Sequence, residues 1–278
     1  MESAREDEIF PYNEKNKILN EDNLMKLLVP YDTDKFYDIN FYRRAFIHKS
    51  YVTRKNENYE TGNINCPTEC MFLQELSNER LEYLGDSILN SSIASYVFER
   101  YPDENEGFLT VIRTKLVNGK MLANLAKKLG LSEYLVISKQ IDENDGRNNK
   151  NVLEDAFEAL IGAIYLDNEE MNENGFNVAR NWIINFIETH IDFSELIHKN
   201  ENYKDVLIKY CQHTHQFIPK FYEIDVMERN GKKIHTVAVK NDSDDILGIG
   251  KDINRKTAEL NASKHALDFY GYFQYNHK

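Results

Sequence analysis

Apolar residues in the first 195 positions recur mainly every three or four residues, which places them on one face of an α-helix. On this pattern we expect helices within 21–51 and at about 70–100, 108–115, 119–129, 150–166 and 175–190. Pro102 should end the first long helix, because the residue before a proline is disfavoured in helical geometry. Gly130 is well suited to the position just beyond a helix C-terminus. Polar stretches at 52–68 and 138–149 are expected to be loops.

The pattern changes after residue 195. We expect a helix at 202–213, strands at 217–227, 234–239 and 246–249, and a last helix at 254–270. An Asn-Gly pair at 230–231 predicts a tight turn between the first two strands. The predicted fold class is therefore an all-α domain followed by a small α+β domain with the order α-β-β-β-α.

The chain is long enough for two such domains, with 278 residues of which 41% are hydrophobic. We expect a polar N-terminal extension with little fixed structure at 1–20, a helical domain at 21–195 and the α+β domain at 201–275, with a linker near 192–201.

No window approaches the roughly 18 uncharged apolar residues of a transmembrane helix, so no membrane association is expected. The acidic N-terminus lacks the apolar stretch of a secretory signal, which favours an intracellular, cytoplasmic protein. The three cysteines, Cys66, Cys70 and Cys211, argue against a disulfide framework. Cys66 and Cys70 have no second Cys or His pair at zinc-site spacing nearby.

The net charge of −12 is unevenly distributed. Residues 201–278 contain 12 Lys and Arg against 11 Asp and Glu, a balance of +1, so the first 200 residues hold 22 against 35, a balance of −13. Affinity for phosphate rests mainly on Lys and Arg. Any nucleic-acid role of the acidic part must therefore use local basic patches, or metal ions that offset the carboxylates.

Two segments, 78–87 and 153–167, carry carboxylates at helical spacing among apolar residues. Glu79, Glu82 and Asp86 share one helix face. Asp155 and Glu158 share a face of the second segment. Two such stripes facing each other would bind hard divalent cations such as Mg²⁺, whereas the plainer interpretation is a pair of solvated faces.

Spacing alone leaves one choice open, because Glu154 and Glu158 are as good a pair as Asp155 and Glu158. Gly85 favours a site, because a glycine inside a helix lowers stability by about 1 kcal/mol relative to Ala. Its presence indicates the close approach of another backbone or of a ligand.

The segment 78–87 resembles the signature decapeptide of the ribonuclease III family, and 155–167 is similar to that family's second acidic segment. Residues 45–51 resemble its short His-x-Ser segment, and 106–109 its middle acidic motif. The resemblance covers about 25–275. It implies a helical endonuclease domain followed by a double-stranded-RNA-binding domain.

The resemblance implies that the metal-binding catalytic carboxylates are Glu82, Asp86, Asp155 and Glu158, with Glu79 and Glu106 as secondary acids. It decides for Asp155 over Glu154, where the family usually has a small residue. The implied cofactor is Mg²⁺, with Mn²⁺ as a substitute. Two ions about 4 Å apart can activate water and neutralise a phosphodiester transition state, so His48 is expected to pack or hydrogen-bond and not to act as a base.

The activity implied is cleavage of double-stranded RNA by a homodimer, leaving 5′-phosphate and 3′-hydroxyl ends with short 3′ overhangs. One alternative is a catalytically silent protein that sequesters duplex RNA, although silent relatives lose metal-binding acids and all four are present here. Another is a helical scaffold whose acidic patch binds a basic protein.

Residues 248–262 resemble the third strand and last helix of the double-stranded-RNA-binding module. The residues expected to contact RNA are Lys204, Lys232, Lys233, Lys251, Arg255 and Lys256. Ile208 stands where many members carry a polar contact, and His235 falls at a strand position instead of before it, so modest RNA affinity is expected. The stretch between Tyr51 and Asn78 is also longer than in typical bacterial members.

Overall fold

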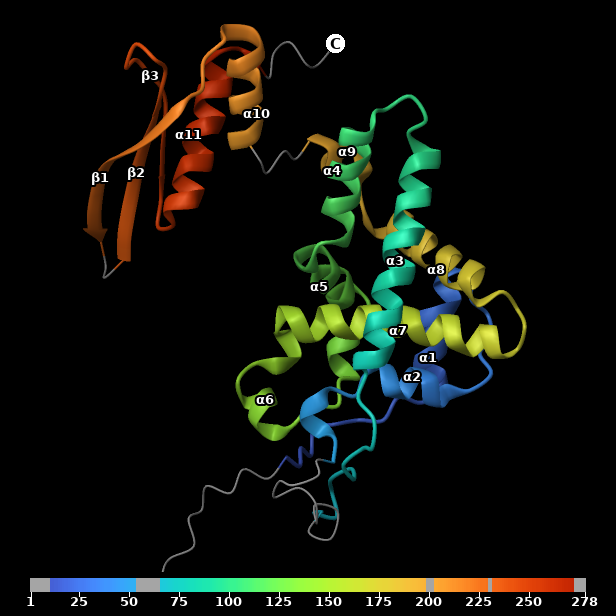
Figure 1. The fold of residues 1–278 in the computed structure, drawn as a ribbon. Coiled ribbons are helices and arrows are strands. Elements are labelled where there is room, and N and C mark those ends of the chain that lie inside the picture. The colour runs from blue at the N-terminus through green and yellow to red at the C-terminus, as the bar shows by residue number, and fades with distance from the viewer. Residues whose placement is uncertain (1–10, 54–65, 199–202, 230–231, 273–278) are drawn as a thin grey trace, which may run out of the picture. The chain divides into compact units, whose positions relative to one another are not determined.

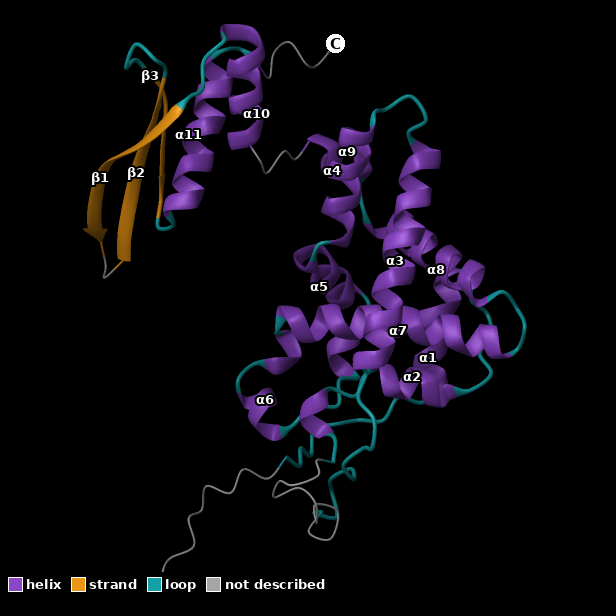
Figure 2. Ribbon diagram, in the orientation of Figure 1, coloured by secondary structure: helices purple, strands orange, loops and turns teal. Residues whose placement is uncertain are grey.

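The computed structural model describes residues 11–53, 66–198, 203–229 and 232–272, which fall into two compact units, Met1–Phe193 and Ser194–Lys278 (Figure 1). The first unit is helical and the second combines helices with a sheet (Figure 2). None of the helices described is both long and apolar enough to cross a membrane. The fold class predicted from the sequence is confirmed.

The α-helices of the first unit, with α9 running on from it, are α1 (Glu21–Leu28), α2 (Ile39–Ala45), α3 (Glu79–Arg100), α4 (Glu106–Val117), α5 (Gly119–Lys128), α6 (Lys139–Glu143), α7 (Lys150–Glu170), α8 (Gly175–His190) and α9 (Phe193–His198). Helix α7 forms the centre of this unit, and α2, α3, α5 and α8 pack around it (Figure 1). Every residue from Ala156 to Ile164 is buried, including Glu158. An apolar helix buried on all sides can carry a carboxylate only at high electrostatic cost.

Helix α3 begins at Glu79 and not near residue 70, so the predicted start is wrong. The preceding segment is held in extended form, since the backbone N–H of Gln74 donates to the Tyr51 carbonyl at 3.1 Å and the N–H of Thr53 donates to the Gln74 carbonyl at 2.9 Å. The Tyr51 hydroxyl also donates to the Met71 carbonyl at 2.8 Å. These long-range bonds outweigh a local preference for helix. Residues 54–65 lie outside the part described.

Residues 11–20 are fixed, although little structure was expected there. The side-chain amides of Asn13 and Asn16 both donate to the Ile137 carbonyl, and the Ile137 N–H donates back to Asn16 Oδ1 at 3.1 Å. Tyr12 and Leu19 are buried. The polar sequence of this segment therefore reflects buried hydrogen bonding, which composition does not distinguish from solvation.

Two stretches expected to be irregular contain short helices. Within 138–149, α6 is capped by Ser138, whose hydroxyl accepts from the Ile141 N–H. Arg147 stabilises this region by donating to the carbonyls of Ser132 and Leu135. Within the linker expected at 192–201 lies α9, and its first residue Phe193 packs beneath the Arg100 guanidinium.

The second unit contains α10 (Tyr203–Tyr210), a π-helical turn (Cys211–His215), β1 (Lys220–Arg229), β2 (Lys232–Lys240), β3 (Ile246–Asp252) and α11 (Arg255–Phe269). The strands form an antiparallel sheet in the order β1-β2-β3. Gly248 and Gly250 let α11 lie directly on β3, because a Cβ at either position would fall within 2.4 Å of a helix carbonyl oxygen. The turn predicted at 230–231 lies outside the described residues.

Candidate active site and nucleic-acid interface

Helices α3 and α7 cross with their backbones in contact at two glycines. A Cβ on Gly85 would lie 1.8 Å from the Glu158 carbonyl oxygen, and one on Gly162 would lie 2.3 Å from the Leu81 carbonyl oxygen. Real Cβ atoms do not approach so closely, so each helix requires glycine where it meets the other. The close backbone approach expected at Gly85 is confirmed. The crossing brings the two carboxylate-bearing helices into contact next to these acids.

The four carboxylates differ in exposure. Glu158 is buried, with 8% of its surface accessible, whereas Glu82 and Asp155 are half-buried and Asp86 is exposed. Within the described part of the chain, the Glu158 carboxylate makes no hydrogen bond or ion pair. A buried acid with no cationic partner is unfavourable when ionised.

The electrostatics reflect this arrangement. Burial, followed by the charge of Asp86 and then by the charges of other acids, raises the pKa of Glu158 to about 8. Burial, followed by the charge of Asp155, raises the pKa of Glu82. Burial, followed by the charge of Glu154, raises the pKa of Asp155. The acids of α3 and α7 therefore repel one another, and the cluster would gain from a positive charge.

Both candidates left open by the spacing lie near this cluster, in different surroundings. Glu154 extends toward the start of α5, where a Cβ on Gly119 would fall 2.1 Å from Glu154 Oε2. Its partner along α7 is Lys150, at 4.0 Å. The charge of Asp155 acts instead on Glu82, whose pKa it raises. The charge of Glu154 still reaches Glu158, whose pKa it also raises.

The two secondary acids are both exposed. Glu79 accepts a hydrogen bond from Ser77 and forms an ion pair with Lys49 at 3.4 Å. Glu106 begins α4, where it accepts from the Thr110 hydroxyl at 2.8 Å. Glu79 contributes to the raised pKa of Glu82.

His48 is engaged in local hydrogen bonding, as expected. The backbone N–H of Ser50 donates to His48 Nδ1 at 3.1 Å, and the Ser50 hydroxyl accepts from the Ser138 N–H at 3.0 Å. Together these bonds fix the start of a short 3₁₀ turn at Lys49–Tyr51. The turn places Lys49 beside Glu79.

Three further residues of the site were not identified from the sequence. Lys49 is a cation that opposes the upward pKa shifts of Glu82 and Asp155. Asn90 donates to Asp86 Oδ1 at 2.6 Å. The third is Gly162, the partner of Gly85 at the crossing. Asn90 follows Asp86 by one helical turn, and Gly162 interrupts an apolar helix, so the sequence contained a pattern that could have identified both residues. No spacing in the sequence pointed to Lys49.

Among the described residues, no group of three or more Asp, Glu, His or Cys side chains is already arranged so as to hold a metal ion. The four acids are near enough to shift one another's pKa values, but they are not drawn together around a common point. Like charges repel, so drawing these acids together would require a positive charge between them.

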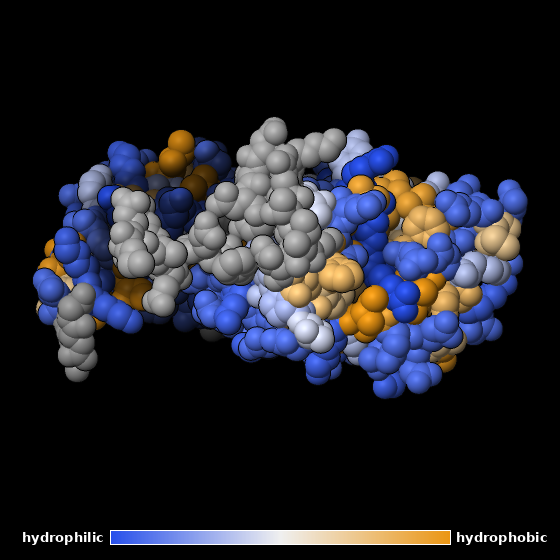
Figure 3. All heavy atoms as spheres, turned by 90° about the horizontal axis from the view of Figure 1, so that it is seen from below, coloured by the Kyte–Doolittle hydropathy of each residue, from blue (hydrophilic) through white to orange (hydrophobic). Residues whose placement is uncertain are grey.

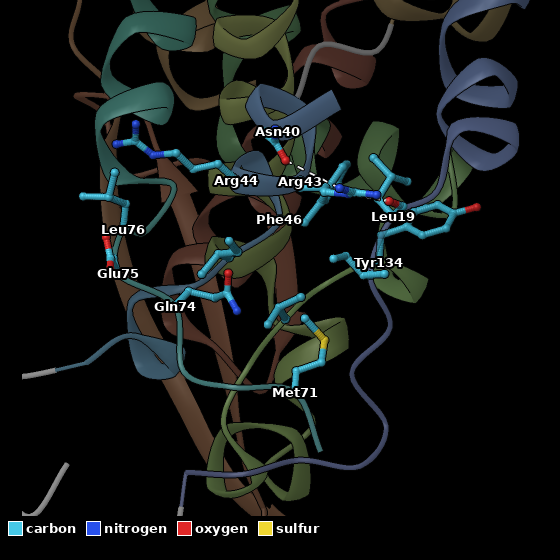
Figure 4. Close-up of a pocket in the computed structure, with 13 residues that line it drawn as sticks. Leu19, Asn40, Arg43, Arg44, Phe46, Met71, Gln74, Glu75, Leu76 and Tyr134 are labelled. Carbon is cyan, nitrogen blue, oxygen red and sulfur yellow. Dashed lines mark hydrogen bonds between the residues drawn. The ribbon is translucent and has the colours of Figure 1, made fainter. Parts of the chain in front are cut away.

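A cavity of about 360 Å³ lies elsewhere in the first unit, between residues 18–19, α2, 71–76 and 134–136. Figure 4 shows Arg43 and Arg44 extending in opposite directions along one side of it. Their Nε atoms donate to the carbonyls of Leu19 and Ser77, respectively. None of the residues predicted to be functional lines this cavity.

In the second unit, five of the six cations expected to contact RNA are exposed. Lys251 is the second-last residue of β3, and Arg255 and Lys256 begin α11, where Asn254 Oδ1 accepts from the Lys256 N–H. Because β2 runs antiparallel to β3, the start of β2 with Lys232 and Lys233 lies toward the same end of the sheet (Figure 1). His235 lies within β2, as expected, and pairs with Glu223.

The sixth cation, Lys204 on α10, is half-buried and bound to an acid. Its Nζ donates to Glu259 Oε2 at 2.6 Å and lies 4.5 Å from the centre of the Phe221 ring. The structure therefore brings Lys204 to α11 but pairs it internally.

Comparisons with known proteins agree with this architecture. A family model described as "Ribonuclease-III-like" matches residues 38–191, and one described as "Double-stranded RNA binding motif" matches residues 203–270. The chain is 36% identical over 192 residues to "Ribonuclease 3" of Chlorobium chlorochromatii, covering 69% of this chain and 74% of that protein. It is 33% identical over 230 residues to "Ribonuclease 3" of Leptospira interrogans, covering 83% and 84%, respectively.

A protein of Acanthamoeba polyphaga mimivirus named "Probable ribonuclease 3" is 30% identical over 93% of this chain, which spans only 47% of that relative's length. Among solved structures, the nuclease domain of ribonuclease III from Campylobacter jejuni is 31% identical and matches 62% of this chain and 99% of that domain, with a TM-score of 0.48. The matching family model and the bacterial relatives together show that the chain belongs to the ribonuclease III family of endoribonucleases, with a nuclease domain followed by a double-stranded-RNA-binding domain.

Proposed function

We propose that Glu82, Asp86, Asp155 and Glu158 form a metal-binding active site that hydrolyses phosphodiester bonds of double-stranded RNA. The observation that carries this proposal is the glycine-to-glycine crossing of α3 and α7, which places three of the acids near the fourth, the buried Glu158, whose carboxylate has no cationic partner among the described residues. Carboxylate oxygens are the ligands that hard divalent cations prefer.

The donor set fits Mg²⁺, for which Mn²⁺ would substitute. Bound divalent ions would supply an activated water and neutralise the charge that develops on the phosphate. The chain's own residues hold and orient these ligands. Asn90 fixes the Asp86 carboxylate through its hydrogen bond, and Lys49 restrains Glu79 at the edge of the site. Glu79 and Glu106 then serve as secondary acids facing the RNA or a second subunit.

We further propose that the chain acts as a homodimer and leaves 5′-phosphate and 3′-hydroxyl ends with short 3′ overhangs. Two sites facing opposite strands of one duplex would produce such ends. The nuclease domain carries apolar patches on the face seen in Figure 3. Its large exposed apolar side chains include Tyr83, which lies on α3 beside Glu82 and has 78% of its surface accessible, and also Phe72 and Leu76. Contiguous exposed apolar patches are typical of protein contacts.

The second domain would contact the duplex through phosphates. The cations at one end of its sheet and at the start of α11 suit the shape-based recognition of A-form RNA. They also offset the acidic balance of the nuclease domain, where −13 arises from 22 basic and 35 acidic residues in the first 200 positions. An intracellular, cytoplasmic location stays a prediction.

The test is cleavage of end-labelled duplex RNA by the full chain in Mg²⁺, in Mn²⁺ or in EDTA. Glu158→Gln should abolish metal-dependent cleavage, because it removes the buried charge of the ligand set at constant size. Glu170→Gln is the matched control, since it makes the same change at an exposed position at the far end of α7. The chemistry of the product ends is read by phosphatase treatment and adaptor ligation.

Each outcome decides between the alternatives. Cleavage by Glu158→Gln at the rate of the unsubstituted chain would remove Glu158 from the site. Binding of duplex RNA without cleavage under any metal condition would favour the silent RNA-binding protein. Absence of both binding and cleavage would favour the scaffold.

A further inference from the structure

Glu259 lies between two of the cations expected to contact RNA. On α11 it accepts from Lys204 Nζ at 2.6 Å through one carboxylate oxygen, and its other oxygen is 3.5 Å from Arg255 Nε. The Glu259 side chain is only 15% exposed, whereas both cations are more accessible. A single acid therefore serves as the counter-ion of two positive side chains from two helices.

The position of Lys204 is fixed from three sides. It belongs to α10, bonds to Glu259 on α11 and stacks over the Phe221 ring on β1. A cation held between a carboxylate and an aromatic face is well satisfied without any ligand. To meet a phosphate, Lys204 must exchange an existing charge-assisted bond for a new one.

The other four cations are not engaged in this way. Within the described residues, the side chains of Lys232, Lys233, Lys251 and Lys256 make no ion pair. Of the six cations expected to contact RNA, four are thus unpaired among the described residues, and the other two belong to a Lys204–Glu259–Arg255 triad whose formal charge is +1 where the two cations alone would carry +2.

We propose that Glu259 limits the affinity of this domain for duplex RNA by occupying, as an internal counter-ion, the place that a backbone phosphate would take between Lys204 and Arg255. The inference rests on the proposed contact between this domain and RNA. Beyond that contact, it assigns to Glu259 a role in setting the affinity, because its carboxylate neutralises part of the charge of the two cations. In this arrangement the main contacts with duplex RNA are made by Lys232, Lys233, Lys251 and Lys256.

The magnitude follows from counter-ion release. Each phosphate neutralised by a protein cation makes the slope of log K against log salt steeper by about 0.9 for a duplex. Removing the charge of Glu259 should free one such contact. The slope should therefore steepen by about one, and affinity at about 0.1 M salt should rise roughly three- to tenfold.

The experiment measures anisotropy of a labelled RNA duplex bound by the full chain in EDTA, over a series of salt concentrations. A duplex of at least about 16 base pairs matches the span of such a domain. Glu259→Gln should bind more tightly, because the amide keeps the size and acceptor of the side chain but not its charge. Asp268→Asn is the matched control, an exposed acid on the same helix with the same change of charge.

A second comparison uses exposed cations and leaves Glu259 intact. Arg255→Gln should weaken binding less than Lys256→Gln does, since Arg255 is already partly neutralised and its neighbour is not.

A third comparison is a double-mutant cycle. Adding Lys204→Gln to Glu259→Gln should remove most of the affinity gained by Glu259→Gln alone.

The proposal is overturned if Glu259→Gln binds no more tightly than the unsubstituted chain, or if Asp268→Asn raises affinity and slope equally. A loss for Arg255→Gln at least as large as for Lys256→Gln also overturns it, and this comparison applies even if Glu259→Gln does not fold. If the unsubstituted chain binds no duplex RNA, the proposed role of the domain itself fails. Binding that is unaffected by Glu259→Gln refutes only the role of Glu259.

Discussion

Gly85→Ala should damage both the fold and the active site, because the added methyl group has no space at the crossing of α3 and α7. The new Cβ would lie 1.8 Å from the Glu158 carbonyl oxygen and 2.9 Å from the Gly162 nitrogen, where ordinary contact begins at 3.4 Å. These are backbone atoms, so no side-chain rotation relieves the clash. The helices must separate by more than 1 Å.

Two opposing effects determine how much Gly85→Ala changes the free energy of unfolding. Alanine favours an exposed helix over glycine by about 1 kcal/mol. Overpacking a core typically lowers stability by about 1–3 kcal/mol, and a rigid backbone obstacle places this site at the upper end or beyond. We expect a net loss of about 2 kcal/mol, which in a domain of this size lowers Tm by roughly 4–8 °C. Displacing Glu158 from Glu82 by about 1 Å should lower cleavage by around 100-fold.

The matched control is Gly107→Ala in α4. Its Cβ would meet only Asn105 Oδ1, at 3.2 Å, and the position is exposed. We expect its free energy of unfolding to change by less than about 1 kcal/mol and its cleavage rate to fall far less than that of Gly85→Ala. Thermal denaturation followed by circular dichroism and a duplex cleavage assay in Mg²⁺ measure the two effects. If Gly85→Ala proved as stable and as active as Gly107→Ala, the reasoning about the crossing would be refuted.

Three more predictions concern charge and assembly. Glu158 has a pKa near 4.5 when unfolded and about 8 when folded, so the free energy of unfolding of the metal-free protein should decrease as the pH rises from 4.5 to 8. Urea titrations at several pH values should show that Glu158→Gln reduces this decrease by about 1–4 kcal/mol. An equal dependence on pH in the two proteins would contradict this. Gly119→Ala should leave Tm nearly unchanged, because the new Cβ would meet only the end of the flexible Glu154 side chain, which can turn away; a Tm loss of several degrees that Glu154→Ala restores would contradict this. Tyr83→Asp should convert a dimer to a monomer in light scattering, with folding unchanged, and a persistent dimer would place the interface elsewhere.

The elements that could be predicted from the sequence are those set by local periodicity. The apolar pattern located α7 and α8, and the Asn-Gly turn signal lay between two strands that do pair. The start of α3 was missed because Leu73 and Leu76 stand three residues apart, a spacing that fits a helix, while bonds from residues 51–53 hold the segment extended. Such bonds join positions more than 20 residues apart, beyond the reach of any local pattern.

The candidate site shows the same division. Spacing placed Glu82 and Asp86 on one face, but it could not choose between Glu154 and Asp155, since both are near the cluster and only tertiary contacts separate their surroundings. The bond between Lys204 and Glu259 spans 55 positions. The sequence around Lys204 and Glu259 mixes acidic and basic residues, a pattern that predicts exposed cations. It does not indicate which acid neutralises which cation.

The glycine contact between α3 and α7 has a consequence for how freely the nuclease domain can vary. The separation of the two carboxylate pairs is set where main chain meets main chain, without an intervening side chain whose size could alter it. Substitutions in the surrounding apolar interior can therefore accumulate, or be introduced to raise thermal tolerance, while the spacing of the acids is retained. Residues 85 and 162 form the exception, and they can change only together with the path of both helices.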